Sequence, residues 1–264
     1  MPKKEQKFIL IAGPCVIEEE RLTFKIAQRL KEIVANFPLH FIFKASFDKA
    51  NRTRLNSFRG PGLEKGLTIL KKIKDKLKIP VLSDVHCVSQ IKSAEKVLDV
   101  IQIPAFLCRQ TDLILEAART KKTINIKKGQ FLSPYDVKYI IEKVESTSNK
   151  NILLTERGTF FGYNNLVVDF RSFGILKSFG YPVIFDVTHS LQRPSANRGV
   201  SGGERKFVVP LGRAAVSFGV DGIFCEVHPQ PQKALSDKAT SFPLYQVEKL
   251  LKRVLKIRKI LDEE

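Results

Sequence analysis

Polar side chains that can bind anions, bind metal ions or transfer protons recur at the ends of eight short apolar runs. In chain order they are Cys15, Lys44, Lys49, Asn51, Arg52, Asp84, His86, Gln102, Arg109, Lys127, Lys128, Glu156, Arg157, Asp186, His189, Glu226 and His228. Such an arrangement is hard to obtain by chance. If the runs are parallel strands of a barrel, their carboxyl ends share one rim, and the pattern predicts a single site there.

Cations in this set indicate the kind of ligand. They are Lys44, Lys49, Arg52, Lys128 and Arg157. At the ends of apolar strands they concentrate positive charge in a pocket, which suits substrates that carry phosphate and carboxylate groups. The alternative for each cation is a side chain that only extends into solvent at the rim.

A second group has the chemistry of metal ligands: Cys15, His189, Glu226 and, from the following loop, Asp237. Thiolate, imidazole and carboxylates together suit Fe²⁺, Zn²⁺, Mn²⁺ or Co²⁺ better than Mg²⁺ or Ca²⁺. Because the residues come singly from different strand ends, their spacing does not identify a site. A small buried thiol is the alternative interpretation of Cys15.

The other three cysteines are expected to be structural. Two-residue alternation along the last apolar run places Glu226 and His228 on the face opposite Cys225. The four cysteines are widely scattered along the chain, Cys87 and Cys108 included, and the sequence has no CxxC pair. This cysteine usage predicts a reducing cytoplasm.

The elements that must position these residues alternate along the chain. Eight β-rich runs are expected as strands: 8–13, 41–46, 80–85, 100–104, 123–128, 151–156, 182–187 and 222–227. Their nearly continuous apolar character indicates a sheet that is covered on both faces. Amphipathic helical patterns lie between them, most clearly at 19–36, 62–77 and 243–261.

Eight such strand–helix units in 264 residues are typical of a (β/α)₈ TIM barrel of class α/β. A doubly wound open sheet is the alternative, but it usually has fewer strands. The sequence has no linker-like segment, so residues 1–264 are expected to form one catalytic domain. The longest irregular stretch, 190–205, is interpreted as a mobile loop over the site.

Composition excludes several classes of protein. Hydrophobic residues make up 43% and charged residues 27% of the chain, and the formal net charge is +18. No apolar run approaches the ~20 residues that span a bilayer. The charged start followed by FILIAGPCVI imitates a signal peptide, but it has no small-x-small cleavage site and is interpreted as a buried strand. The lysine-rich helices have no interleaved aromatic residues, which disfavours nucleic-acid binding, the distant alternative.

Longer motifs carry a resemblance to a known family. They are IAGPC (11–15), FKASFDKANRT (43–53), SFRGPG (57–62), IQIPAFLCRQTDL (101–113), NIKKGQF (125–131), LTERGTFFGYNNLVVDFRS (154–172), FDVTHS (185–190) and EVHPQPQKALSD (226–237). Over nearly the whole chain, the sequence resembles the 3-deoxy-D-manno-octulosonate 8-phosphate synthases, or 2-dehydro-3-deoxyphosphooctonate aldolases. This resemblance implies a cytoplasmic homotetrameric transferase on a (β/α)₈ barrel. The reaction condenses phosphoenolpyruvate with D-arabinose 5-phosphate and water, for lipopolysaccharide biosynthesis.

A sister family, the 3-deoxy-D-arabino-heptulosonate 7-phosphate synthases, uses erythrose 4-phosphate on the same barrel and is the alternative. Its second-strand loop typically reads KPRT, whereas this chain reads KANRT at 49–53. The pair Ala50-Asn51 lengthens the loop and supplies an amide for a sugar hydroxyl. Thr53 stands where the resembled family usually has Ser, and either hydroxyl reaches a phosphate.

The resemblance also implies residue roles. Lys44, Lys49, Gln102, the backbone at Ala105, Lys128 and Arg157 would hold phosphoenolpyruvate. Arabinose 5-phosphate would be held by Asn51, Arg52 and Thr53, with Arg109 from a neighbouring subunit. One divalent metal ion would be bound by Cys15, His189, Glu226 and Asp237, since metal-dependent members have Cys and metal-independent members Asn in the first-strand motif. Asp237, His189 and a metal-bound water are the candidates for the general acid and base.

Overall fold

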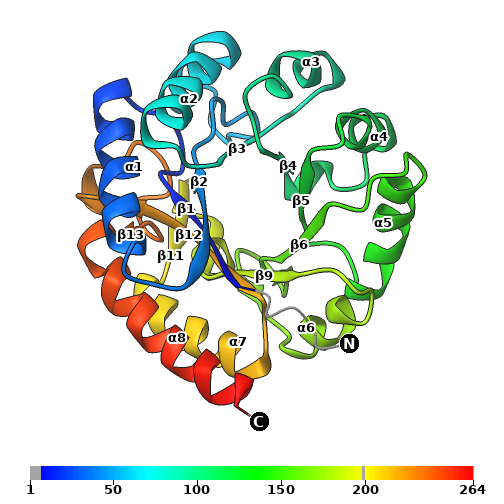
Figure 1. Cartoon of the computed structure of the whole chain (residues 1–264), viewed down its shortest axis with the longest axis vertical. Coiled ribbons are helices and arrows are strands. Elements are labelled where there is room, and N and C mark those ends of the chain that lie inside the picture. Colours follow the sequence, from blue (N-terminus) through cyan, green and yellow to red (C-terminus); the bar gives the residue numbers. More distant parts are fainter. Residues whose placement is uncertain (1–6, 198–199, 264) are drawn as a thin grey trace.

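The structure is a computed structural model that describes residues 7–197 and 200–263. Within these ranges, eight parallel strands form a closed barrel and eight α-helices surround it (Figure 1). The barrel strands are β1 (Phe8–Gly13), β2 (Leu39–Lys44), β3 (Val81–Asp84), β4 (Val100–Ile103), β5 (Thr123–Lys127), β6 (Ile152–Glu156), β9 (Val183–Asp186) and β12 (Gly222–His228). The helices are α1 (Glu20–Val34), α2 (Leu63–Leu77), α3 (Ile91–Ala94), α4 (Thr111–Arg119), α5 (Val137–Glu145), α6 (Arg171–Lys177), α7 (Val208–Phe218) and α8 (Val247–Asp262). The predicted (β/α)₈ TIM barrel is confirmed.

The apolar strands are covered on both faces, and the alternation of side chains explains how. In β1, Ile9 and Ile11 point into the barrel, whereas Phe8 and Leu10 pack in the outer core with the helices. The inner cluster comprises Ile9, Ile11, Ile42, Leu82, Val100, Leu153, Ile184 and Phe224. The barrel is therefore filled by side chains below its carboxyl rim.

The barrel closes where β1 pairs with both β2 and β12. Gly13 lies at the end of this seam, and a Cβ atom there would be 1.9 Å from the backbone oxygen of Lys44. The glycine of the IAGPC motif thus allows the close approach of two backbones beside Cys15. The second strand extends to Leu39, before the expected start at 41, because Leu39 pairs with Phe8.

Further short strands lie at the carboxyl end of the barrel. They are β7 (Thr159–Phe160) with β8 (Leu166–Val167), β10 (Gln192–Asn197) with β11 (Val200–Gly203), and β13 (Phe242–Pro243) beside β12. The expectation of an irregular loop over 190–205 is wrong, because antiparallel pairing joins Gln192 to Gly203 and Arg193 to Gly202. Residues 198 and 199 of that segment, and residues 1–6 of the charged start, lie outside the described part.

The last helix begins later than the expected start at 243. Pro243 pairs with His228, and a turn of 3₁₀-helix over Leu244–Gln246 precedes the α-helix. The apolar run near the start of the chain is a buried strand, as expected. Among the described residues, no helix has the length and apolar character needed to cross a membrane.

Candidate active site and metal centre

The carboxyl ends of the barrel strands surround a pocket of about 280 Å³. Polar side chains reach it because they lie two residues beyond members of the inner apolar cluster and so share their inward face. Examples are Asp84 after Leu82, Gln102 after Val100, Asp186 after Ile184 and Glu226 after Phe224. The structure thus brings residues from all parts of the barrel to one site.

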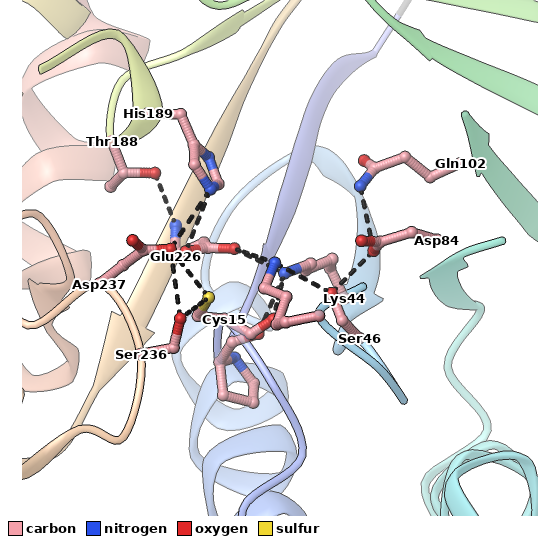
Figure 2. Close-up of polar contacts among 12 residues, drawn as sticks. Cys15, Lys44, Ser46, Asp84, Gln102, Thr188, His189, Glu226, Ser236 and Asp237 are labelled. Atoms are coloured by element: carbon pink, nitrogen blue, oxygen red, sulfur yellow. Dashed lines mark hydrogen bonds and ion pairs between the residues drawn. The ribbon is translucent and has the colours of Figure 1, made fainter. Parts of the chain in front are cut away.

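Potential metal ligands converge on one side of this pocket. The donor atoms of Cys15, Glu226 and Asp237 all lie within 4.8 Å of one another. Figure 2 shows His189 beside them, with Nε2 3.4 Å from Glu226 Oε2 and 3.8 Å from Asp237 Oδ2. The loop after β1, strand β12, the loop after β12 and the turn after β9 contribute one residue each.

The surroundings of Cys15 fit a bound divalent cation. Its Sγ atom lies 2.8 Å from Ser236 Oγ and 3.0 Å from Asp237 Oδ2. Burial raises the pKa of the thiol well above its usual range, and the charges of Asp237 and Glu226 raise it further. Glu226 Oε2 is buried and accepts no hydrogen bond from the described residues. A cation would supply its missing partner and stabilise the thiolate, and the mixed sulfur, nitrogen and oxygen donors suit a first-row metal.

Asp186, at the end of β9, organises His189 and Lys127. Its Oδ2 atom lies 2.6 Å from His189 Nδ1 and also accepts a hydrogen bond from Lys127 Nζ. Its Oδ1 atom accepts hydrogen bonds from the backbone N–H groups of His189, at 2.8 Å, and Thr188, at 3.1 Å. When the imidazole is neutral, a carboxylate at Nδ1 favours the proton on that nitrogen, which leaves the Nε2 lone pair facing Glu226 and Asp237.

Lysines surround Glu226 from the opposite side. Lys44 Nζ lies 2.6 Å from Glu226 Oε1, and both side chains are 1% exposed. Lys49 Nζ lies 3.8 Å from the same oxygen. Burial alone would raise the pKa of Glu226, but the charges of His189, Lys44 and Lys49 outweigh it and lower the pKa to about 2. Lys44 also donates to the backbone oxygen of Cys15 at 2.7 Å, so it contacts two of the candidate metal ligands.

The lysines that line the pocket have opposite pKa shifts. Burial lowers the pKa of Lys127 to about 8, although Asp186 opposes this shift. Burial also acts to lower the pKa of Lys49, but the surrounding acidic groups (Cys15, Asp84, Glu226 and Asp237) outweigh it and raise the pKa. Lys49 is therefore held in its charged form, whereas burial lowers the pKa of Lys127 from its usual range to about 8.

A chain of hydrogen bonds crosses the inside of the barrel and ends on Asp84. Thr155 donates to Asn125 Oδ1 at 2.6 Å, Asn125 to Gln102 Oε1 at 2.8 Å, and Gln102 to Asp84 Oδ1 at 3.3 Å. Ser46 donates to the same Asp84 oxygen at 2.7 Å. The chain holds the amide of Gln102 in one orientation at the edge of the pocket.

Arg157 follows β6 and enters the pocket, where it is 5% exposed. Its Nη2 atom donates to Gln192 Oε1 at 2.8 Å, and its Nη1 atom is buried with no hydrogen-bond partner among the described residues. Gln192 in turn donates to Asp237 Oδ1 at 2.9 Å and so links Arg157 to a candidate metal ligand. A buried guanidinium with a free donor is suited to an anionic ligand.

Lys128 does not line the pocket. The resemblance assigns it to phosphoenolpyruvate, but its Nζ atom donates to the backbone oxygens of Gly129 and Leu132, outside the barrel wall. Its neighbour Lys127 points inward instead. The signal was present in the sequence: in TINIKK, Asn125 and Lys127 share one face and Lys128 shares the other with the two isoleucines.

The residues expected to hold the sugar phosphate lie at the rim. Asn51 lines the pocket and is exposed, Thr53 is exposed, and Arg52 donates from Nε to the backbone oxygen of Phe58 at 2.9 Å. Ala105 also lines the pocket. Arg109 is exposed and does not line the pocket formed by this chain.

The remaining cysteines stand apart from the metal centre. Cys108 and Cys225 are buried in the outer core, in agreement with the structural role expected for them. Cys87 is exposed, so it does not contribute to the core. The sequence patterns assign no specific role to Asp84, Asp186, Lys127 or Gln192. The first three are identifiable from the sequence only as residues at strand ends.

Comparisons with known proteins agree with this geometry. The profile of the DAHP synthetase I family matches residues 3–263. A 2-dehydro-3-deoxyphosphooctonate aldolase from Geotalea uraniireducens (strain Rf4) is 57% identical over 257 residues, which cover 97% of this chain and 94% of the relative. Relatives of the same name from Trichlorobacter lovleyi and Geobacter sulfurreducens are 57% and 53% identical, and the matches cover 93% and 97% of this chain and 90% and 94% of those proteins. The chain therefore belongs to the DAHP synthetase I family and, within it, to the 2-dehydro-3-deoxyphosphooctonate aldolases.

Proposed function

We propose that the protein condenses phosphoenolpyruvate with D-arabinose 5-phosphate and water to give 3-deoxy-D-manno-octulosonate 8-phosphate and phosphate. The observation that carries this proposal is the 57% identity, over nearly the full length of both chains, to proteins named for that activity. The cation-lined pocket at the carboxyl rim of the barrel supports it, because both organic substrates are anions.

Phosphoenolpyruvate binds to the inward cations in this proposal. Lys49, Lys127 and Arg157 line the pocket and would hold its phosphate and carboxylate, with Gln102 and the backbone at Ala105. Lys127 takes the place that the resemblance gives to Lys128, since Lys127 is the lysine that points inward. Lys44 would not contact phosphoenolpyruvate directly and would act through its ion pair with Glu226.

Arabinose 5-phosphate binds at the outer edge of the pocket. Asn51 is placed for a sugar hydroxyl, and Arg52 and Thr53 for the phosphate. Arg52 has a buried Nη2 atom with no hydrogen-bond partner among the described residues, a donor available to an anion. Arg109 would reach the phosphate from a neighbouring subunit of a homotetramer, which agrees with its exposure on this chain.

Cys15, His189, Glu226 and Asp237 would hold one divalent ion, Fe²⁺, Zn²⁺, Mn²⁺ or Co²⁺. When bound, such an ion can orient the aldehyde or polarise the water that adds to C2. The chain's own residues prepare this site: Asp186 orients His189, and Lys44 and Lys49 keep Glu226 ionised.

The reaction joins C3 of phosphoenolpyruvate to the aldehyde carbon, adds water at C2 and releases phosphate by C–O cleavage. The enol carbon is a weak nucleophile, so the protein must bring two anions together in a reactive orientation. Lys49, Lys127 and Arg157 offset their repulsion and stabilise developing negative charge. With Nε2 on the ion and Nδ1 held by Asp186, His189 has no free nitrogen for proton transfer, so Asp237 is the side chain proposed as general acid or base.

The product would enter lipopolysaccharide inner-core synthesis in the cytoplasm. The four cysteines are free thiols in the described structure, which supports a reducing compartment.

The description of the matched family favours one second candidate, the synthesis of 3-deoxy-D-arabino-heptulosonate 7-phosphate from erythrose 4-phosphate. A phosphate-release assay with phosphoenolpyruvate and each sugar phosphate distinguishes the two. We expect much faster turnover with arabinose 5-phosphate. Equal rates or a preference for the four-carbon sugar would reverse the assignment. No release with either sugar, together with salt-sensitive DNA binding, would favour a binding protein.

A further inference from the structure

Lys128 is a buried cation whose three donors are already used inside the protein. Its Nζ atom donates to the backbone oxygens of Gly129 and Leu132 and to Thr159 Oγ1, each at 3.1 Å. An ammonium group has three protons, so none is left for a substrate anion. These contacts join the loop after β5 to the start of β7.

Glu156 lies beside Lys128 on the same side of the barrel wall. Its Oε2 atom lies 3.6 Å from Lys128 Nζ, and each side chain is 2% exposed. The register of β5 and β6 pairs Lys127 with Thr155, and the residues that follow them, Lys128 and Glu156, both point outward. A buried carboxylate needs such a partner, because burial without compensation is costly.

The other oxygen of Glu156 holds the backbone that carries Arg157. Oε1 accepts hydrogen bonds from the N–H groups of Arg157, at 2.9 Å, and Gly158, at 2.7 Å. Gly158 has a φ of +93°, a turn conformation that only glycine adopts readily. This turn sends the Arg157 side chain into the pocket, where Nη1 has no hydrogen-bond partner among the described residues.

We infer that Lys128 and Glu156 form a clamp behind the pocket that positions Arg157 for phosphoenolpyruvate, so that Lys128 is a positioning residue and contacts no substrate. The charge of Lys128 attracts Glu156 Oε2, which accepts no hydrogen bond from the described residues, and this ion pair holds the carboxylate in place. The carboxylate in turn fixes the Arg157–Gly158 turn, and the turn aims the guanidinium. The role of the clamp in binding phosphoenolpyruvate rests on the proposed function.

A double-mutant cycle with Arg157 tests the clamp. The variants are Lys128→Met, Arg157→Met and their combination, and the measured quantities are kcat and the KM values of both substrates. Misplacing a binding group by about 1 Å can cost up to roughly 100-fold. We expect Lys128→Met to raise the KM for phosphoenolpyruvate about 10- to 100-fold while the KM for arabinose 5-phosphate stays within about twofold. In the Arg157→Met background, Lys128→Met should change the KM for phosphoenolpyruvate by less than about twofold.

Lys128→Met leaves Glu156 buried without a partner and is at risk of not folding. Lys128→Met/Glu156→Gln removes both charges, which proteins tolerate better than loss of one partner. The double variant should also show a raised KM for phosphoenolpyruvate, because the amide is no longer held by an ion pair. Exposed Lys150→Met is the matched control and should leave every parameter unchanged.

Two results would overturn the clamp. An equal effect of Lys128→Met with and without Arg157 would mean that Lys128 acts independently of it. An unchanged KM for phosphoenolpyruvate in the folded single or double variant, with only a lower Tm, would mean a purely structural role. Wild-type turnover tests the proposed function separately. If wild type turned over neither sugar, the same cycle would be measured as the Kd of phosphoenolpyruvate by calorimetry.

Discussion

His189 Nδ1 lies 2.6 Å from Asp186 Oδ2, and this contact aims the opposite ring nitrogen at Glu226 and Asp237. The same Asp186 oxygen accepts a hydrogen bond from Lys127. One buried carboxylate thereby connects the expected metal centre to the expected phosphoenolpyruvate site. A change at Asp186 should consequently disturb both sites.

Asp186→Asn is expected to weaken metal binding without removing a ligand. The amide can present N–H to His189 Nδ1, which favours the proton on Nε2 and blocks the lone pair there. Loss of such an outer partner typically lowers metal affinity about 10- to 100-fold. Titration with Co²⁺, followed by its absorption bands, measures the effect. Exposed Asp169→Asn is the control, and equal Co²⁺ affinities of Asp186→Asn and wild type would contradict the expected role of Asp186.

Removal of the metal should abolish turnover. A chelator is expected to inactivate the wild type, and Mn²⁺, Fe²⁺, Co²⁺ or Zn²⁺ should restore activity to different extents. His189→Ala and Glu226→Ala each remove a ligand and should lower both metal content and rate. Metal analysis of the purified protein and rate assays check this. Chelator-insensitive activity in a wild type purified without metal would make Cys15 a structural thiol.

Cys15→Asn should behave differently from Cys15→Ala. The resemblance described above implies that metal-independent members of the family have Asn at this position, and an amide can hydrogen-bond a substrate or water. We expect Cys15→Asn to lose its metal and keep measurable turnover that a chelator does not affect. Cys15→Ala offers neither a ligand nor a hydrogen bond and should be much slower. Equal rates for the two variants would argue against this role of the amide.

The activity should fall on the alkaline side as Lys127 loses its proton. Burial lowers the pKa of this lysine to about 8, so above that pH the free enzyme loses a cation from the pocket. Because kcat/KM reports ionisations of the free enzyme, kcat/KM for phosphoenolpyruvate should decline above about pH 8. Lys127→Arg keeps its charge and should remove this decline. An identical alkaline limb in Lys127→Arg would assign it to another group.

The net charge of +18 should come from two groups of cations, those that bind substrate and those that only keep the surface hydrated. Lys72 on α2 and Lys256 on α8 are exposed, and their neutralisation to Met should leave turnover nearly unchanged. Arg157→Met removes a buried contact to an anion and should cost about 2–5 kcal/mol in kcat/KM. Steady-state kinetics of the three variants test the division. Comparable losses at exposed and buried positions would contradict it.

The sequence was sufficient to predict the barrel because strands and helices are specified by local patterns of residues. Each strand is an apolar run, each helix has an apolar stripe, and their alternation leaves few topologies. Local patterns were insufficient where long-range pairing overrides them. The polar segment 190–205 has no strand-like pattern, yet Gln192 pairs with Gly203 and delivers its amide to Arg157 and Asp237.

The sequence by itself determined which residue types reach the carboxyl rim, since strand ends follow from the apolar runs. The tertiary structure alone decided which of them meet. Cys15 and Asp237 are 222 positions apart, and only closure of β1 onto β12 brings their side chains to 3.0 Å. The structure also decided that Lys127 lines the pocket, whereas Lys128 points away from it and contacts Gly129, Leu132 and Glu156. Lys127 is the last residue of β5 and Lys128 follows it, so the two side chains lie on opposite sides of the barrel wall, which is why different roles are proposed for them.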